Sequence, residues 1–545
     1  MAPRAVPKLG PRGLHVVRHA ALAAAGAAVV AWLGPPGADL AAHVYQRALF
    51  LQHGFALWNN YWYAGRYSFV TYSIVYYPLA AFVGIKLLAV VASALAAAGF
   101  AALVQEEWPA AGPWPARTFS VMAALSVITG AYPYALGLGF GLLALCALRA
   151  RRTWLFAPLV MLTFAASPLA FFLLVLVLAA ATVKGRGNRA VAPAATVVVI
   201  GLGAVVLWRL FPDDGRFPFS ASELAATLTF CGLGLAFTWH VPTARVLNRF
   251  FGVYAFASIV AFAFPSSLGE NIARLRFVAL PIAVLALALR SWKPVVPAAI
   301  VLLLAASWNV TPLAFSFARE SSDPSANAAY WTPVIRYLKP RLGPSYRVEA
   351  VDTAGHWDAV YLPQHGIPIV RGWFRQDDFP QNKVLYSRLG VKAYLTWLRN
   401  MGVAYVVVTD APLDYSARGE AALIRNGRSS LRLVKALPHA VIYEVRRPHG
   451  IVTGAPGAEV AKLGASSMTL ALPRRGAYRV AIRYSPYWHA SAGCVRERKD
   501  GMISLVVPDP GTVQLRFVVT AKSAVDAGIG EKPVCPAKPK LDPDG

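Results

Sequence analysis

Asp39 is the residue whose type and position point most directly to chemistry. It follows the first long apolar run, residues 15–34, in the sequence Gly37-Ala-Asp-Leu-Ala-Ala-His43. A carboxylate at the mouth of a membrane is costly unless it is solvated or used, and a carboxylate can serve as a general base. His43 lies four residues on, which places it on the same face if this segment is helical. The structural alternative is an N-cap, because an aspartate before a helix accepts backbone N–H bonds.

A second group of candidate residues lies in Ser266-Ser-Leu-Gly-Glu-Asn-Ile-Ala-Arg-Leu-Arg276, just before an apolar run. Arginine at a membrane surface suits a phosphate, which a guanidinium can hold through two hydrogen bonds. Arg274 and Arg276 are therefore candidates for phosphate binding. Alternatively, they extend to lipid headgroups or pair with Glu270.

Other polar clusters are weaker candidates. His356-Trp-Asp358 and Arg371–Asp378 mix aromatic and charged groups, as sugar sites do, but ordinary polar cores also contain such mixtures. Asp213-Asp214 more readily forms a turn. No CxxC motif or His/Cys cluster indicates zinc, so we predict neither a metal site nor a cofactor.

The elements that must position these residues are apolar. The chain has 545 residues, 57% of them hydrophobic and only 14% charged, whereas a soluble domain is nearer a quarter charged. Of its 26 carboxylates, seven lie in residues 1–315 and nineteen in 316–545. This division indicates a membrane-embedded region followed by a water-exposed region. Much of the excess positive charge lies in short loops between apolar runs, as membrane topology requires, so no nucleic-acid partner is expected.

About eleven membrane spans are predicted, since a span needs roughly 20 apolar residues. Their approximate ranges are 15–34, 76–104, 117–130, 134–148, 154–166, 168–183, 190–211, 222–239, 249–264, 277–290 and 294–314. Two apolar runs are broken near their middles, at residues 130–134 and at Ser167-Pro168, where each can turn between two short helices. The first span reads as an uncleaved signal anchor. Basic residues fall mainly on one side, which predicts a cytoplasmic N-terminus, a long outer loop at 35–75 and an extracytoplasmic C-terminal region.

The outer loop has two parts. Residues 39–55 fit an amphipathic helix lying on the membrane surface. The following stretch, Trp58-Asn-Asn-Tyr-Trp-Tyr-Ala-Gly-Arg-Tyr67, is rich in aromatic residues. These could line a site or form an ordinary interfacial belt.

The C-terminal region is predicted to contain two folded parts. Residues 316–330 form a polar linker that opens an α/β domain over 316–450, with strands at 346–351 and 402–410 and a helix at 391–401. Short strands separated by Gly/Pro turns suggest a small β-sandwich over 451–525. The tail, 526–545, has a composition typical of disorder. Cys494 and Cys535 could pair in an oxidising compartment.

The whole pattern resembles the GT-C superfamily of membrane glycosyltransferases, and within it the bacterial YfhO-like and 6-pyruvoyl-tetrahydropterin-synthase-related membrane proteins. The residues that carry the resemblance are Gly37-Ala-Asp39 with His43, Trp58 and Gly65, Gly269-Glu-Asn-Ile-Ala-Arg-Leu275, and Tyr484-Ser-Pro-Tyr-Trp-His489. The resemblance covers the membrane region, about 315 residues.

The resemblance implies transfer of a sugar from a polyprenyl-phosphate donor to a cell-envelope glycan, lipid or protein at the outer face of the plasma membrane. Asp39 would be the catalytic base, and Arg274 or Arg276 would hold the lipid phosphate. His43, Trp58 and Glu270 would contact substrate. Metal-dependent members of the class carry a second acidic motif in an outer loop near the start of the chain. The absence of a convincing one here puts metal dependence in doubt.

Two other classes of function compete with this hypothesis. A non-catalytic scaffold for envelope assembly would use the outer region for binding. A transporter would usually place charged groups at mid-membrane, and the apolar runs hold almost none.

Overall fold

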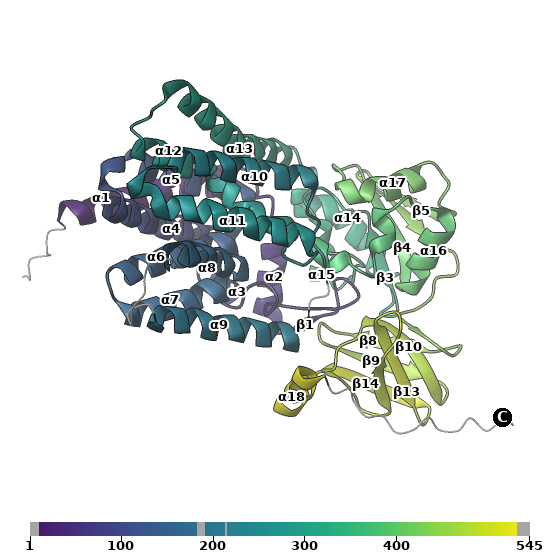
Figure 1. Ribbon diagram of the computed structural model, residues 1–545. Coiled ribbons are helices and arrows are strands. Elements are labelled where there is room, and N and C mark those ends of the chain that lie inside the picture. Colours follow the sequence, from purple (N-terminus) through teal and green to yellow (C-terminus); the bar gives the residue numbers. More distant parts are fainter. Residues whose placement is uncertain (1–9, 183–190, 213–214, 531–545) are drawn as a thin grey trace, which may run out of the picture. The chain divides into compact units, whose positions relative to one another are not determined.

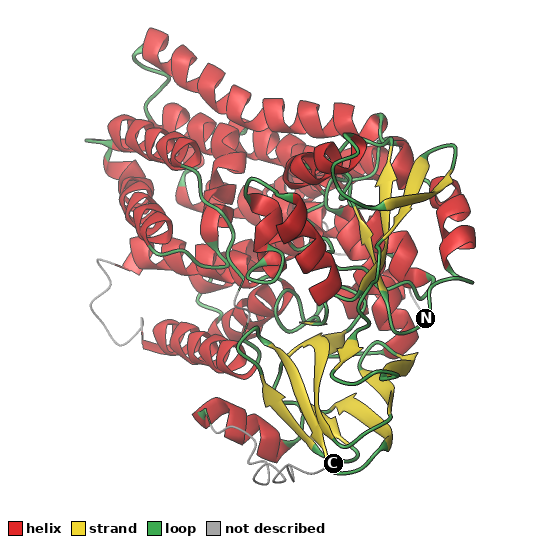
Figure 2. Ribbon diagram, turned by 90° about the vertical axis from the view of Figure 1, so that its right-hand side faces the viewer, coloured by secondary structure: helices red, strands yellow, loops and turns green. Residues whose placement is uncertain are grey.

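The protein, described here from a computed structural model, divides into two compact units. The structure describes residues 10–182, 191–212 and 215–530. The helical unit comprises Met1–Leu40, Tyr72–Val205 and Arg216–Ser322, and the mixed unit comprises Ala41–Thr71, Val206–Gly215 and Asp323–Gly545. Every strand among the described residues belongs to the mixed unit, and these strands are the yellow arrows of Figure 2.

Apolar runs form the helices of the helical unit, labelled in Figure 1. These are α1 (Pro11–Leu33), α3 (Tyr76–Val83), α4 (Ile85–Glu107), α5 (Trp114–Leu125), α6 (Tyr132–Arg149), α7 (Thr153–Ala166), α8 (Pro168–Thr182), α9 (Val191–Leu210, which ends in the mixed unit), α10 (Ala221–Thr238), α11 (Arg245–Ala263), α12 (Ala279–Leu289) and α13 (Val295–Ser321). By length and composition, seven helices of the described residues could cross a membrane. An eighth is possible if the bent pair Gly269–Arg276 and Ala279–Leu289 counts as one span.

The two broken runs divide where the sequence predicts. The first turns at Gly130, whose φ of +72° suits glycine, and α6 begins two residues later. The second ends α7 at Ala166 and restarts with Pro168 as the first residue of α8, a position where proline's missing N–H costs nothing. The predicted span 76–104 divides further, at Gly84, into α3 and α4. Since α5, α7 and α8 have only 12, 14 and 15 residues, the count of eleven spans stays a prediction.

Small residues allow the helices to approach closely. A Cβ on Gly99 of α4 would lie 2.7 Å from the Cβ of Leu142, and one on Gly139 of α6 would lie 3.0 Å from the Cβ of Leu95. Close backbone approach at glycine is typical of helix pairs that pack in membranes.

The mixed unit contains an α/β part built on one four-stranded sheet, ordered β3-β4-β6-β5. Its elements are α14 (Ala328–Leu338), β3 (Arg347–Ala350), α15 (Asp358–Gln364), α16 (Val391–Asn400), β4 (Val403–Thr409), α17 (Arg418–Arg425), β5 (Arg432–Ala436) and β6 (Ala440–Glu444). β3 and β4 run parallel, and the other pairs are antiparallel. Trp397 and Leu398 of α16 pack in one core with Val406 of β4, so the predicted strands and helix are confirmed.

A β-sandwich forms the rest of the mixed unit. Its two sheets are ordered β12-β13-β10-β7 and β11-β14-β9-β8. The strands are β7 (Val452–Thr453), β8 (Glu459–Leu463), β9 (Ser467–Leu472), β10 (Gly476–Arg483), β11 (Trp488–Ala490), β12 (Cys494–Glu497), β13 (Met502–Val507) and β14 (Gly511–Phe517). Both sheets contribute to one apolar core, which includes Val480 and Leu515.

Two predictions about the polar segments are wrong in part. Residues 316–321 are not linker, because they continue α13, and a short 3-10 helix (Pro324–Ala326) and α14 follow. Residues 526–529 are not disordered, because they complete α18 (Ala521–Ile529). The tail beyond residue 530, Asp213-Asp214 and Cys535 lie outside the described residues. Cys494 is disulfide-bonded, while Cys146 and Cys231 are free, so only the identity of its partner, predicted as Cys535, stays a prediction.

Two buried carboxyl groups make the mixed unit sensitive to pH. Glu349 of β3 and Glu420 of α17 are both buried, and the hydroxyl of Tyr394 donates to Oε1 of Glu420 at 2.6 Å. Burial and the neighbouring Glu420 raise the pKa of Glu349 well above its ordinary value, and burial raises the pKa of Glu420 to about 7.

For Glu420 the window runs from about pH 4.5 to about pH 7, where the unfolded chain loses this proton while the folded chain keeps it. Stability should therefore fall as pH rises through this window. Glu420→Gln keeps an acceptor for Tyr394 but does not titrate. We expect it to stabilise the full chain at pH 8, by up to about 3 kcal/mol, and to give no gain near pH 4.5. Thermal unfolding at the two pH values measures this difference, and an equal effect at both would contradict the prediction.

Candidate functional site

Two glycines hold Asp39 in place within the helical unit. The N–H of Asp39 donates to the carbonyl of Thr129 at 3.0 Å, in the 3-10 helix that ends at the Gly130 turn. A Cβ on Gly130 would lie 2.6 Å from the Asp39 nitrogen, and one on Gly37 would lie 2.9 Å from the Gly130 Cα. The chain on either side of Asp39 thus rests directly on the turn that breaks the first apolar run.

Gly130→Ala is expected to destabilise the protein by more than Gly530→Ala. Both glycines have a left-handed backbone, with φ and ψ of +72° and 4° at Gly130 and +78° and 15° at Gly530, so both substitutions carry a strain of about 1–2 kcal/mol. A Cβ on Gly530 would meet nothing within 4 Å, whereas at Gly130 it would collide with the Asp39 backbone, which adds an overpacking cost of about 1–3 kcal/mol. Thermal unfolding of the two variants measures the difference, and equal losses would count against the contact.

A cavity of about 320 Å³ opens beside Asp39 in the helical unit, within the usual size range of ligand pockets. Most of its polar lining comes from helix ends and connecting segments, and most of its apolar lining comes from helix interiors. The polar residues are Asp39, Ser93, Ser126, Thr129, Tyr134, Glu270, Asn271, Arg274, Asn309 and Ser316. The apolar side includes Phe119, Met122, Leu138, Val278 and Leu313. The predicted site residues Asp39, Glu270 and Arg274 thus line one cavity.

The structure separates the two candidate arginines. Arg274 lines the cavity, with Nη2 4.0 Å from Oδ2 of Asp39 and Nε donating to Asn271 Oδ1 at 3.1 Å. Arg276 is not among the lining residues, is largely buried and forms an ion pair with Glu223 of α10. The prediction that either arginine could face the site is therefore narrowed to Arg274.

The environment of Asp39 suits a base rather than a helix cap. Within the described part of the chain, no hydrogen bond reaches its carboxylate oxygens, and its ion-pair partner is Arg274. Burial raises the pKa of Asp39 to about 6, against the opposing effects of Arg274 and Arg319. The side chain nevertheless keeps 19% of its surface accessible. An accessible carboxylate with a pKa near the operating pH can accept a proton in a reaction.

His43 and Trp58 were predicted to contact substrate. Both residues belong to the mixed unit and are buried there. Trp58 is 2% exposed, donates from Nε1 to Asn60 Oδ1 at 2.8 Å, and stacks on Phe517 with ring centroids 4.9 Å apart. His43 lies on α2 (Leu40–His53) and is fully buried. A ring so enclosed has almost no surface for a sugar, so the structure gives Trp58 a place in a core instead of a binding site.

The rest of the aromatic stretch is likewise built into the mixed unit, and it carries the short strands β1 (Trp58–Asn59) and β2 (Arg66–Tyr67). Trp62 donates from Nε1 to the carbonyl of Ala359 at 2.9 Å. Arg66 pairs with Asp377 at 2.5 Å and lies 4.2 Å from the centre of the Phe374 ring. These residues form an internal framework and not the interfacial belt that was the alternative prediction.

The clusters at 356–358 and 371–378 are also internal. Arg371 pairs with Asp352 and with Asp378, both at 2.9 Å, and all three are buried. Arg375 binds Asp414 at 2.8 Å. These charged side chains neutralise one another inside the core. The structure therefore favours the interpretation of these clusters as a polar core over their interpretation as a sugar site.

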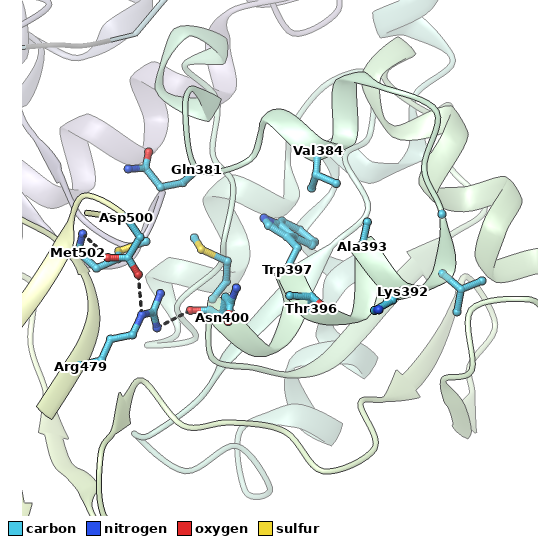
Figure 3. Close-up of a pocket in the computed structure, with 13 residues that line it drawn as sticks. Gln381, Val384, Lys392, Ala393, Thr396, Trp397, Asn400, Arg479, Asp500 and Met502 are labelled. Carbon is cyan, nitrogen blue, oxygen red and sulfur yellow. Dashed lines mark hydrogen bonds and ion pairs between the residues drawn. The ribbon is translucent and has the colours of Figure 1, made fainter. Parts of the chain in front are cut away.

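A second, open cavity of about 900 Å³ lies in the mixed unit, between α16 and the sandwich strands β10 and β13 (Figure 3). Its walls include Val391, Trp397 and Met401. Its charged pair, Arg479 and Asp500, is joined at 2.9 Å, and Arg479 also donates to the Asn400 carbonyl. Because Arg479 and Asp500 bind one another, they are less able to bind or react with a ligand than the charged residues of the Asp39 cavity.

Comparison with known proteins adds no assignment: no protein-family model matches the chain, and no curated protein matches it either. Among the described residues no group of three or more His, Cys, Asp or Glu side chains could hold a metal ion.

Sequence reasoning missed several residues of the Asp39 cavity, among them Tyr134, Asn271 and Asn309. Tyr134 lies in the Gly-Ala-Tyr-Pro-Tyr break, and Asn271 lies between the two charges of the 266–276 motif, so both carried a usable signal. Asn309 lies in an apolar run, and its amide binds the carbonyl of Arg276 and the N–H of Leu280. A contact of that kind has no sequence signature.

Proposed function

We propose that the protein is a membrane glycosyltransferase of GT-C type, with about eleven spans, a cytoplasmic N-terminus and an extracytoplasmic C-terminal region in the plasma membrane. It would move a sugar from a polyprenyl phosphate to a glycan, lipid or protein of the cell envelope. The observation that carries the proposal is the placement of Asp39 and Arg274, 4.0 Å apart, on one cavity with an apolar side. Such a cavity can take a phosphate together with part of a lipid chain.

The chemistry assigns one role to each charge. Asp39 accepts the proton of an acceptor hydroxyl while the hydroxyl oxygen attacks the anomeric carbon. The bond from that carbon to the phosphate oxygen breaks, and the phosphate leaves with the electron pair. Arg274 meets the negative charge that develops there. A single displacement of this kind inverts the configuration at the anomeric carbon.

A bound donor would also improve the base. In the free protein Arg274 lowers the pKa of Asp39. A donor phosphate that pairs with Arg274 places a negative charge near the carboxylate and cancels part of that effect. Asp39 would then hold the transferred proton more strongly once the donor is in place.

The neighbouring arginines give a matched test. In proteoliposomes supplied with labelled polyprenyl-phosphate sugar, Arg274→Gln is expected to lower kcat/KM by about 10²-fold or more, the scale of losing a charged contact that forms in the transition state. Arg276→Gln, two residues away but paired with Glu223, should change kcat/KM far less. Thermal unfolding of both variants shows whether a loss of activity comes from a loss of folded protein.

Equal losses in the two variants, at equal stability, would contradict the assignment of Arg274 to the donor phosphate. The scaffold is the second candidate function, and the open cavity on the mixed unit is the observation in its favour. It predicts no transfer by the wild-type chain and partner binding that survives Asp39→Asn.

A further inference from the structure

Helix α18 (Ala521–Ile529) is attached to the β-sandwich with its apolar face outward. Thr520 and Ser523 form a capping box at its start, and Gly530, with φ +78°, ends it. Ala527 packs against the sandwich core. Val525 is 60% exposed and Ile529 is 66% exposed, and with Ala521 they repeat every four residues, so they share one face.

This orientation is the reverse of what a helix on a water-soluble domain shows, where the apolar stripe faces the core. Lys522 is also exposed, one residue after Ala521. A lysine beside an apolar face can keep its stem in an apolar layer and its ammonium group in water or near phosphate. Apolar side chains flanked by lysine are typical of helices that lie in a membrane interface.

The end of α9 lies beside α18. Leu207, Leu210 and Phe211 pack against the same sandwich core as Ala527. Tyr487 donates its hydroxyl proton to the Leu210 carbonyl at 2.8 Å. A Cβ on Gly528 would lie 3.7 Å from Cδ2 of Leu210, so α18 at Gly528 lies close to the last turn of α9. All of these residues belong to the mixed unit.

α9 marks where a bilayer surface would be. It has 20 residues, none of them buried, and is one of the candidate spans. At 1.5 Å per residue it covers roughly 30 Å, the thickness of the hydrocarbon core. Its last turn at Leu210 would therefore reach the boundary between acyl chains and headgroups, where α18 is attached.

We propose that α18 is an interfacial helix whose face of Ala521, Val525 and Ile529 inserts into the lipid surface at the end of α9. The inference rests on α9 crossing the membrane, a part of the proposed function, but not on any catalytic step. It anchors the sandwich to the bilayer through side chains that stay exposed among the described residues.

Site-directed spin labelling of the full chain in proteoliposomes tests this. Single cysteines at Val525 and at Ile529 carry the label, in a background with Cys146→Ser and Cys231→Ser. Cys494 is disulfide-bonded and so does not react with the label, and the same background without an added cysteine measures any labelling elsewhere. Leu433→Cys on β5, 58% exposed, is the matched water control. Val199→Cys in the middle of α9, 66% exposed, is the lipid control.

We expect labels at 525 and 529 to collide with oxygen, which concentrates in lipid, several-fold more than with a water-soluble nickel chelate, as the label at 199 should. The label at 433 should show the opposite ratio. A label at 525 that behaves like the one at 433 would overturn the proposal, and so would protection from both reagents, because that would mean a protein partner or a second copy covers the face. If the label at 199 collides readily with the nickel chelate, α9 does not lie in the membrane. That result would also overturn the proposal for α18.

Discussion

Replacing Asp39 with asparagine is expected to lower sugar transfer by about 10²–10⁴-fold, the usual contribution of a positioned acid or base. The amide has nearly the same shape but cannot accept the proton of the acceptor hydroxyl. Donor binding should change little, because Arg274 remains to hold the phosphate. Single-turnover transfer and equilibrium binding of a labelled polyprenyl-phosphate sugar, both in proteoliposomes, separate the two effects.

The pH profile provides the control for this prediction. Because burial raises the pKa of Asp39 to about 6, the carboxylate form that can act as base is lost as pH falls through this value. Wild-type kcat/KM should therefore fall below about pH 6, and the residual rate of Asp39→Asn should lack this limb. Undiminished transfer by Asp39→Asn would remove Asp39 from the mechanism, and an unchanged limb would assign the titration to another group.

Arg66→Met is expected to destabilise the protein by about 3–5 kcal/mol, the cost of leaving one partner of a buried ion pair alone. Arg66 and Asp377 are both buried and 2.5 Å apart, so removal of the guanidinium leaves a carboxylate with little water. The loss is measured as the fall in the free energy of unfolding of the full chain. The double variant Arg66→Met, Asp377→Leu should recover much of it, because no charge then remains buried.

An exposed pair in the same unit gives the comparison. Arg432 of β5 pairs with Glu444 of β6, and the arginine side chain is mostly exposed. Arg432→Met should cost at most about 1 kcal/mol, as exposed pairs do. If the two single variants lost the same stability, Arg66 would have no special structural role, and the aromatic stretch around it would be held by its rings alone.

Local patterns identified most of the elements. Gly130 and Pro168 broke the apolar runs where their backbone properties require. The β-branched runs at 403–409 and 502–507 became strands. Asp39 was found by its place after an apolar run, and Glu270 and Arg274 by their place before one. In each case the prediction depends only on residues that are close together in the sequence.

The partners of the aromatic stretch could not be found in this way. Trp58, Trp62 and Arg66 are as compatible with a membrane belt as with a core, because both bury rings and leave a polar group to be satisfied. The decision depends on Phe517, Ala359 and Asp377, which lie roughly 300 residues or more away in sequence. The composition of the stretch 58–67 does not indicate whether a membrane surface or another part of the protein will cover it.

By itself the sequence determined which segments are apolar, where they break and which charged residues stand at their ends, because these properties depend on residue type and nearest neighbours. Only the tertiary structure decided that Arg274 faces the cavity with Asp39 while Arg276 turns to Glu223, and that the aromatic stretch 58–67 lies in the core of the mixed unit. Two arginines of one motif have the same chemistry, and the direction of each is set by the charge that long-range packing brings within reach.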